Sequence, residues 1–117
     1  MKRWMLLAAM TAAMVPCAAA AANFSCSGHV QQLGASKTTL VVSIGQGAWP
    51  ICRTDQASGG IGPEMCNLWF SMLMTARATG VQVQLYFNPA ENGGVTGCSG
   101  LGSWISRTPY HLDVLAP

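Results

Sequence analysis

Four cysteines constrain this chain more than any other feature of its sequence. They are Cys26, Cys52, Cys66 and Cys98, within about 95 residues that follow a predicted export leader. An even number of cysteines in a small exported domain favours two disulfide bonds, because the compartment is oxidising and the core is small. Four cysteines allow three pairings. We favour Cys52 with Cys66, which closes a short loop, and Cys26 with Cys98, which ties the two ends of the domain together.

The predicted leader covers residues 1–22 and would be removed on export. After a basic start, an apolar run from Trp4 to Val15 leads to small residues from Ala18 to Ala22, the layout of a secretory signal peptide. The run is shorter than the ~20 residues that span a bilayer, and Pro16 interrupts it. Cys17 follows Met-Val-Pro instead of the small residue that lipidation requires. We therefore expect a secreted or periplasmic protein without a membrane span or lipid.

The remainder, residues 23–117, is long enough for one small domain. It has four basic and four acidic residues, so its formal net charge is zero. Binding of nucleic acid requires a basic groove, because phosphate neutralisation supplies much of the affinity. We therefore expect no nucleic-acid partner.

Few residues in this domain suit catalysis. His29 and His111 are the only histidines, and the acidic residues are scattered along the chain. His111 and Asp113 are two positions apart on a predicted strand, so a base and its orienting carboxylate could share one side. Such a pair is more often part of a solvated strand face. No cysteine–histidine spacing typical of zinc appears. We expect no enzyme, no metal and no cofactor.

The hydrophobic pattern predicts five strands and one helix. Strands are expected at residues 28–33, 39–44, 49–53, 81–87 and 110–115, and residues 81–87 show the clearest alternation. The helix is expected to begin at Pro63 and to end before Gly80, since proline suits the first helical position and glycine the position after the last turn. Three strands, a helix and two strands favour a β-rich, five-stranded OB-fold-like barrel, with the helix between strands 3 and 4. A small α+β sheet with the helix on one face is the alternative.

The helix is more apolar than one buried stripe requires. The expected core-facing residues are Met65, Leu68, Trp69, Met72, Leu73 and Ala76. Phe70 and Met74 lie outside this stripe, and a small core has little room to cover them. Exposed apolar patches usually mark interaction surfaces. We therefore predict that Phe70 and Met74 belong to a homo-oligomer interface.

Several short segments carry a resemblance to a known family. They are SGHV at residues 27–30, Cys52, Cys66, the helix residues Trp69, Leu73 and Ala76, and TGVQVQLYFNP at residues 79–89. Together they resemble the B subunits of subtilase-cytotoxin and typhoid-toxin type. The chain also resembles, more closely, a set of small exported bacterial proteins; that likeness implies no activity.

The resemblance to toxin B subunits implies an OB-fold, a pentameric ring and binding of sialylated glycans on host cells. Ser27 matches a serine that contacts the glycan in those subunits, and Tyr86 matches a tyrosine on their fourth strand. The chain departs from them after Pro89, where ENGGVTGCSGLGSW replaces an aromatic-rich segment. This difference leaves the sugar specificity open.

Two functions remain open from the sequence. One is a non-catalytic recognition module that binds a glycan or a host or envelope protein, with Ser27, Tyr86 and the loop residue Trp104 as ligand-binding candidates. The other is a structural or accessory protein of the envelope without sugar binding.

Overall fold

The structure is a computed structural model that describes residues 22–117. The predicted leader, apart from Ala22, lies outside these residues, and so does Cys17. In the described part of the chain, no helix is long and apolar enough to cross a membrane.

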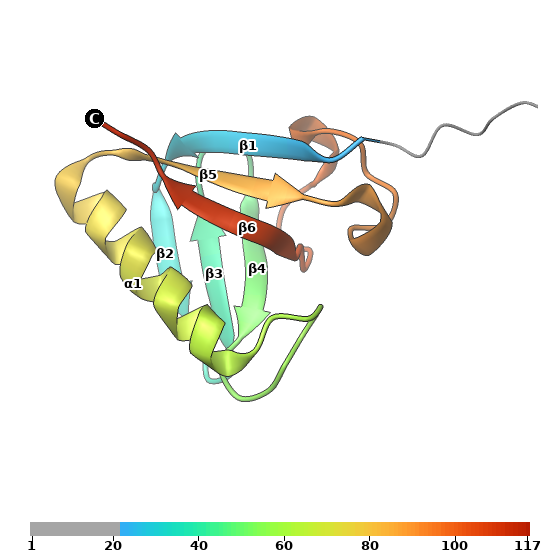
Figure 1. Ribbon diagram of the computed structural model, residues 1–117, viewed down its shortest axis with the longest axis horizontal. Coiled ribbons are helices and arrows are strands. Elements are labelled where there is room, and N and C mark those ends of the chain that lie inside the picture. Colours follow the sequence, from blue (N-terminus) through green and yellow to red (C-terminus); the bar gives the residue numbers. More distant parts are fainter. Residues whose placement is uncertain (1–21) are drawn as a thin grey trace, which may run out of the picture.

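In the described part of the chain, six strands form two antiparallel sheets (Figure 1). The first sheet has the order β1-β5-β6, and the second has the order β2-β3-β4. The strands are β1 (Phe24–His29), β2 (Gln32–Ala35), β3 (Thr39–Ser43), β4 (Ala48–Arg53), β5 (Gln82–Phe87) and β6 (Pro109–Val114). Helix α1 (Pro63–Thr79) connects β4 to β5 and packs against β4, β5 and β6, so it contacts both sheets. Two short 3-10 helices, η1 (Pro89–Glu91) and η2 (Cys98–Gly100), lie between β5 and β6.

The expectation of a five-stranded OB-fold-like barrel is wrong. Residues 22–117 form six strands in two sheets and no closed barrel, and the helix follows the fourth strand. The difference arises at residues 28–33, which the sequence pattern presented as one strand. Cys26 of β1 pairs with Leu85 of the first sheet, whereas Leu33 of β2 pairs with Val42 of the second sheet. The chain therefore changes sheet between β1 and β2.

Gly28 permits the close crossing at this point. A Cβ atom at position 28 would overlap the carbonyl oxygen of Ile44, which follows β3. Only glycine lets the two backbone segments approach this closely. Gly28, where the first strand was expected to begin, is thus the point at which β1 meets the segment that follows β3.

One hydrophobic core fills the space between the sheets and the helix. At its centre, the rings of Trp49 and Phe87 meet edge to face with centroids 5.6 Å apart. The indole N–H of Trp49 donates to the carbonyl of Gly102 at 2.9 Å, which satisfies its polar atom inside the core. Leu73 of the helix and Leu85 of β5 are fully buried in the same cluster.

Two disulfide bonds link separate elements of the fold, in the pairing that we favoured from the sequence. Cys26 bonds to Cys98 across 72 positions, and Cys52 bonds to Cys66 across 14 positions. The first bond holds the loop after β5 against β1. The second fixes the first turn of α1 to β4.

The helix begins and ends where the sequence predicted. Pro63 occupies its first turn, and Gly80 adopts φ 71°, with its N–H bonded to the carbonyl of Ala76. The predicted core stripe is wrong at Met65 and Leu68, which are exposed, while Cys66 is fully buried. The buried side of the helix runs through Cys66, Trp69, Leu73 and Ala76, where the Cys52–Cys66 bond joins it to β4, so Met65 and Leu68 lie off this side.

A buried polar network orders the long connection between β5 and β6. The guanidinium of Arg107 donates from Nε to the carbonyl of Leu101 at 2.9 Å and from Nη1 to the carbonyl of Asn92 at 2.8 Å. The side chain of Asn92 in turn bonds to both backbone groups of Thr108. Both Arg107 and Asn92 are buried. A loop rich in glycine is thereby held in one conformation.

Candidate functional site

The outer face of the sheet β1-β5-β6 carries a group of polar and aromatic side chains linked by hydrogen bonds. Alternation sends Val83, Leu85 and Phe87 into the core, so Gln84 and Tyr86 point outward. Antiparallel pairing then places their neighbours in two rows. These rows, which we call the outer face, are Ser25–Tyr86–His111 and Ser27–Gln84–Asp113.

Side-chain hydrogen bonds fix several of these groups. The phenol of Tyr86 donates to Oδ2 of Asp113 at 3.0 Å, and Nε2 of His111 lies 2.7 Å from Oδ1 of the same carboxylate. The amide of Gln84 donates to the hydroxyl of Ser25 at 2.7 Å. The orientation of Tyr86, His111 and Gln84 is therefore set before any ligand arrives.

These hydrogen bonds favour the ionised form of Asp113 and the neutral form of Tyr86. The hydrogen bond from His111, and then that from Tyr86, lowers the pKa of Asp113. The same carboxylate accepts the phenolic proton and so raises the pKa of Tyr86. At neutral pH the outer face therefore presents an ionised carboxylate and a neutral phenol.

Aromatic rings lie beside these polar groups. The ring of Tyr86 is 5.3 Å from that of His111 and 6.1 Å from that of Tyr110. Tyr86 pairs with His111 but Phe87 pairs with Pro109, so Tyr110 is the extra residue of a β-bulge. The bulge turns Tyr110 toward the helix side of the sheet, where it is exposed.

The structure brings together two of the three ligand-binding residues predicted from the sequence. Ser27 and Tyr86 lie on adjacent strands in neighbouring rows of the outer face. Trp104 lies elsewhere: its backbone N–H bonds to the carbonyl of Ala48 at the start of β4, in the other sheet. It is 65% exposed and has φ 61°.

His111 and Asp113 were predicted to share one side of a strand, but no hydrogen bond to Tyr86 was predicted. That link depends on β6 lying beside β5, which the strand pattern alone does not contain. The carboxylate of Asp113 orients His111, yet no serine, threonine or cysteine bonds to the imidazole within residues 22–117. In the same residues, no three histidine, cysteine, aspartate or glutamate side chains are grouped as metal ligands would be.

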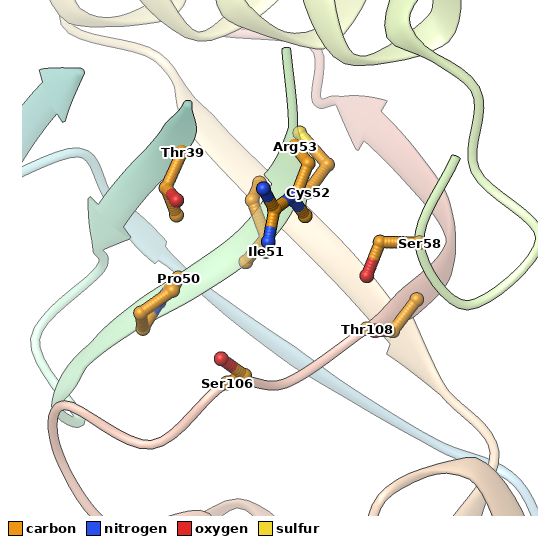
Figure 2. A pocket seen from close by; sticks show the side chains of 8 residues that line it. All are labelled: Thr39, Pro50, Ile51, Cys52, Arg53, Ser58, Ser106 and Thr108. Atoms are coloured by element: carbon orange, nitrogen blue, oxygen red, sulfur yellow. The ribbon is translucent and has the colours of Figure 1, made fainter. Parts of the chain in front are cut away.

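A second feature is a polar pocket of about 180 Å³ beside β4, which we call the β4 pocket (Figure 2). The strand forms its floor from Pro50 to Arg53. Its walls carry four hydroxyl-bearing residues: Thr39, Ser58, Ser106 and Thr108. Arg53 forms a two-point ion pair with Asp55, through Nε and Nη2 at 3.0 Å each, and this hydrogen bonding lowers the pKa of Asp55.

A third feature is an apolar groove of about 320 Å³ between α1 and β6. Met65, Leu68 and Met72 line it from the helix, and Tyr110, Leu112 and His111, which also belongs to the outer face, line it from the strand. Phe70 and Met74, the predicted interface residues, lie outside this groove. Phe70 is half-buried against the core, whereas Met74 is 51% exposed. Only Met74 therefore has the free apolar surface that the sequence suggested for both.

Comparison with known proteins found no relative: no family model, curated protein or solved structure matches the chain.

Proposed function

We propose that this chain is a non-catalytic recognition module of the cell exterior or envelope, and that it binds a glycan on the outer face. The observation that carries the proposal is the fixed cluster of Tyr86, His111 and Asp113, with Gln84 and Ser27 in the adjoining row.

The chemistry of this cluster suits sugars. A sugar ring offers an apolar face of C–H groups and a rim of hydroxyls that donate and accept hydrogen bonds. The rings of Tyr86 and His111 supply apolar surface, while Ser27, Gln84 and Asp113 supply donors and acceptors. Because internal hydrogen bonds already hold Tyr86 and Gln84, little side-chain freedom is lost on binding.

The electrostatics favour a glycan over a nucleic acid. Residues 23–117 have no net charge, and the outer face presents the ionised carboxylate of Asp113. A phosphate backbone would be repelled by that carboxylate and would find no basic groove to neutralise it. Hydroxyl groups have no such requirement.

Two further observations support this proposal. The two disulfides fit an oxidising compartment, as expected for an exported protein. Ser27 and Tyr86, the residues that the resemblance to toxin B subunits pointed to, lie on adjacent strands of one surface. That likeness concerns residues and not the fold, since the two-sheet arrangement differs from the barrel it implied.

A structural or accessory role in the envelope is the second candidate. It is favoured by the apolar groove, where Met65, Leu68 and Tyr110 expose large apolar side chains. Such surface commonly becomes covered by a partner or by another copy of the same chain.

A glycan array with the fluorescently labelled chain 23–117 distinguishes the two. The recognition module binds a subset of glycans, and Tyr86→Ala loses that binding. Trp104→Ala, which changes an exposed aromatic residue in the loop beside the other sheet, serves as the matched control and retains it. Absence of glycan binding by the folded, disulfide-bonded protein would favour the envelope role.

A further inference from the structure

We propose that the β4 pocket is a second binding site, independent of the outer face, for one neutral polyhydroxylated ring such as a monosaccharide unit. It differs from the outer face in its sheet, its residues and its shape.

Three of the four hydroxyl groups of the pocket walls are free, whereas that of Thr39 lies 3.4 Å from the hydroxyl of Thr38. In the part of the chain that the structure describes, the side-chain oxygens of Ser58, Ser106 and Thr108 make no hydrogen bond within the protein. Each can donate one hydrogen bond and accept others, which is the property that a sugar hydroxyl also has. Figure 2 shows Ser58 and Ser106 on opposite sides of the pocket, with Thr108 on the segment that leads to β6.

The backbone of these same residues is fixed. Ser58 exchanges two hydrogen bonds of 3.0 Å with Ile61. Arg107, between Ser106 and Thr108, donates its N–H to the carbonyl of Pro50 at 2.9 Å, and its buried side chain anchors the segment. The walls are thus rigid while their hydroxyls are unpartnered. Sites built this way lose little conformational freedom when a ligand binds.

The glycine-rich loop SGGIG at residues 58–62 packs closely against the segment of Thr108. Gly59 has φ 60°, and a Cβ atom there would collide with the side chain of Thr108. The absence of a side chain at Gly59 lets Ser58 approach the segment of Thr108 from the opposite wall.

Size and charge define the ligand. A volume of about 180 Å³ lies below the range of ~300–1,000 Å³ typical of sites for drug-sized molecules, so it admits a single ring. The ion pair with Asp55 neutralises Arg53 and leaves Nη1 of the guanidinium as a donor. The charge of the lining residue Arg53 is offset by Asp55, which lies beside the pocket, and this balance favours a neutral ligand over an anion.

The test is an amide-shift titration of the chain 23–117 by NMR with D-glucose, D-galactose and D-mannose, and with inorganic phosphate and sulfate as anionic probes. We expect at least one neutral sugar to shift the amides of Ser58, Ser106 and Thr108, with a dissociation constant in the millimolar range. Ser58→Ala and Ser106→Ala should each weaken binding about 5-fold, because each removes one hydrogen bond.

Ser27→Ala is the matched control, since it removes an exposed hydroxyl from the outer face; binding in the pocket should be unchanged. Shifts at Gln84 and Tyr86 report the outer face separately, so failure of one site is distinguished from failure of the other. The inference is overturned if no neutral sugar shifts the pocket amides, if both alanine variants bind like the parent, or if phosphate or sulfate binds there more tightly than every sugar.

Discussion

The phenolic oxygen of Tyr86 lies 3.0 Å from Oδ2 of Asp113, on the neighbouring strand of the same sheet. The other oxygen of that carboxylate meets His111, so one acid orients two rings. Without this link, Tyr86 would be one exposed aromatic residue among several. With it, the side chain of Tyr86 is held in a fixed orientation on the outer face.

Tyr86→Phe should reduce the pH dependence of stability. The folded state lowers the pKa of Asp113, so its contribution is present above about pH 4 and is lost as pH falls through the folded pKa. The folded state raises the pKa of Tyr86, so that contribution is present below about pH 10 and is lost as pH rises further. Urea unfolding across this range measures both. An unchanged alkaline limb in Tyr86→Phe would contradict the assignment.

Removal of each disulfide should destabilise the fold to a different extent. In the chain-entropy account, Cys52→Ala/Cys66→Ala costs ~3 kcal/mol, and Cys26→Ala/Cys98→Ala costs ~4 kcal/mol because its loop is longer. The free energy of unfolding in urea gives both values. A larger loss for the shorter loop would show that strain or packing, and not loop closure, dominates.

Arg107→Lys should lower the free energy of unfolding by ~2 kcal/mol. Lysine keeps the charge but has no planar fork to reach the carbonyls of Leu101 and Asn92 together, and the position is buried. Arg77→Lys, in an exposed last turn of α1, is the control and should change stability by less than ~0.5 kcal/mol. Equal losses of stability in the two variants would show that the buried hydrogen bonds of Arg107 do not stabilise the fold.

The helix allows a test of which apolar residues are core and which are surface. Leu73→Ala should cost ~2–5 kcal/mol, since Leu73 is fully buried. Leu68→Ser and Met74→Ser, at 52% and 51% exposure on the two flanks of α1, should leave stability nearly unchanged. Light scattering during gel filtration then shows whether either flank mediates assembly. A change of oligomeric state only in Met74→Ser would support the predicted interface, and one only in Leu68→Ser would assign it to the groove.

Local patterns in the sequence predicted local structure well. Pro63 and Gly80 bound the helix because their backbone preferences act within one turn. The alternation of residues 81–87 predicted which side of β5 is buried. Ser27 and Tyr86 were proposed from a resemblance, and strand pairing places them on one face.

Features that depend on long-range pairing were not predictable in this way. A strand pattern does not name its partner, so the change of sheet between β1 and β2 was missed and a barrel was expected. The apolar period of α1 did not reveal that its buried side would include the disulfide-bonded Cys66 and leave Met65 and Leu68 exposed. The β4 pocket joins segments near residues 39, 50–53, 58 and 106–108, which no local motif connects.

The most direct test of glycan recognition maps the footprint of a glycan selected on the array. Amide shifts of the chain 23–117 are followed by NMR during titration with that glycan. We predict that the largest shifts fall on Ser27, Gln84, Tyr86 and His111, and that Tyr86→Ala weakens binding at least ~10-fold while Trp104→Ala does not, since a buried aromatic contact contributes on the order of 1.4 kcal/mol or more. Shifts confined to other surfaces, or full affinity in Tyr86→Ala, would contradict the account.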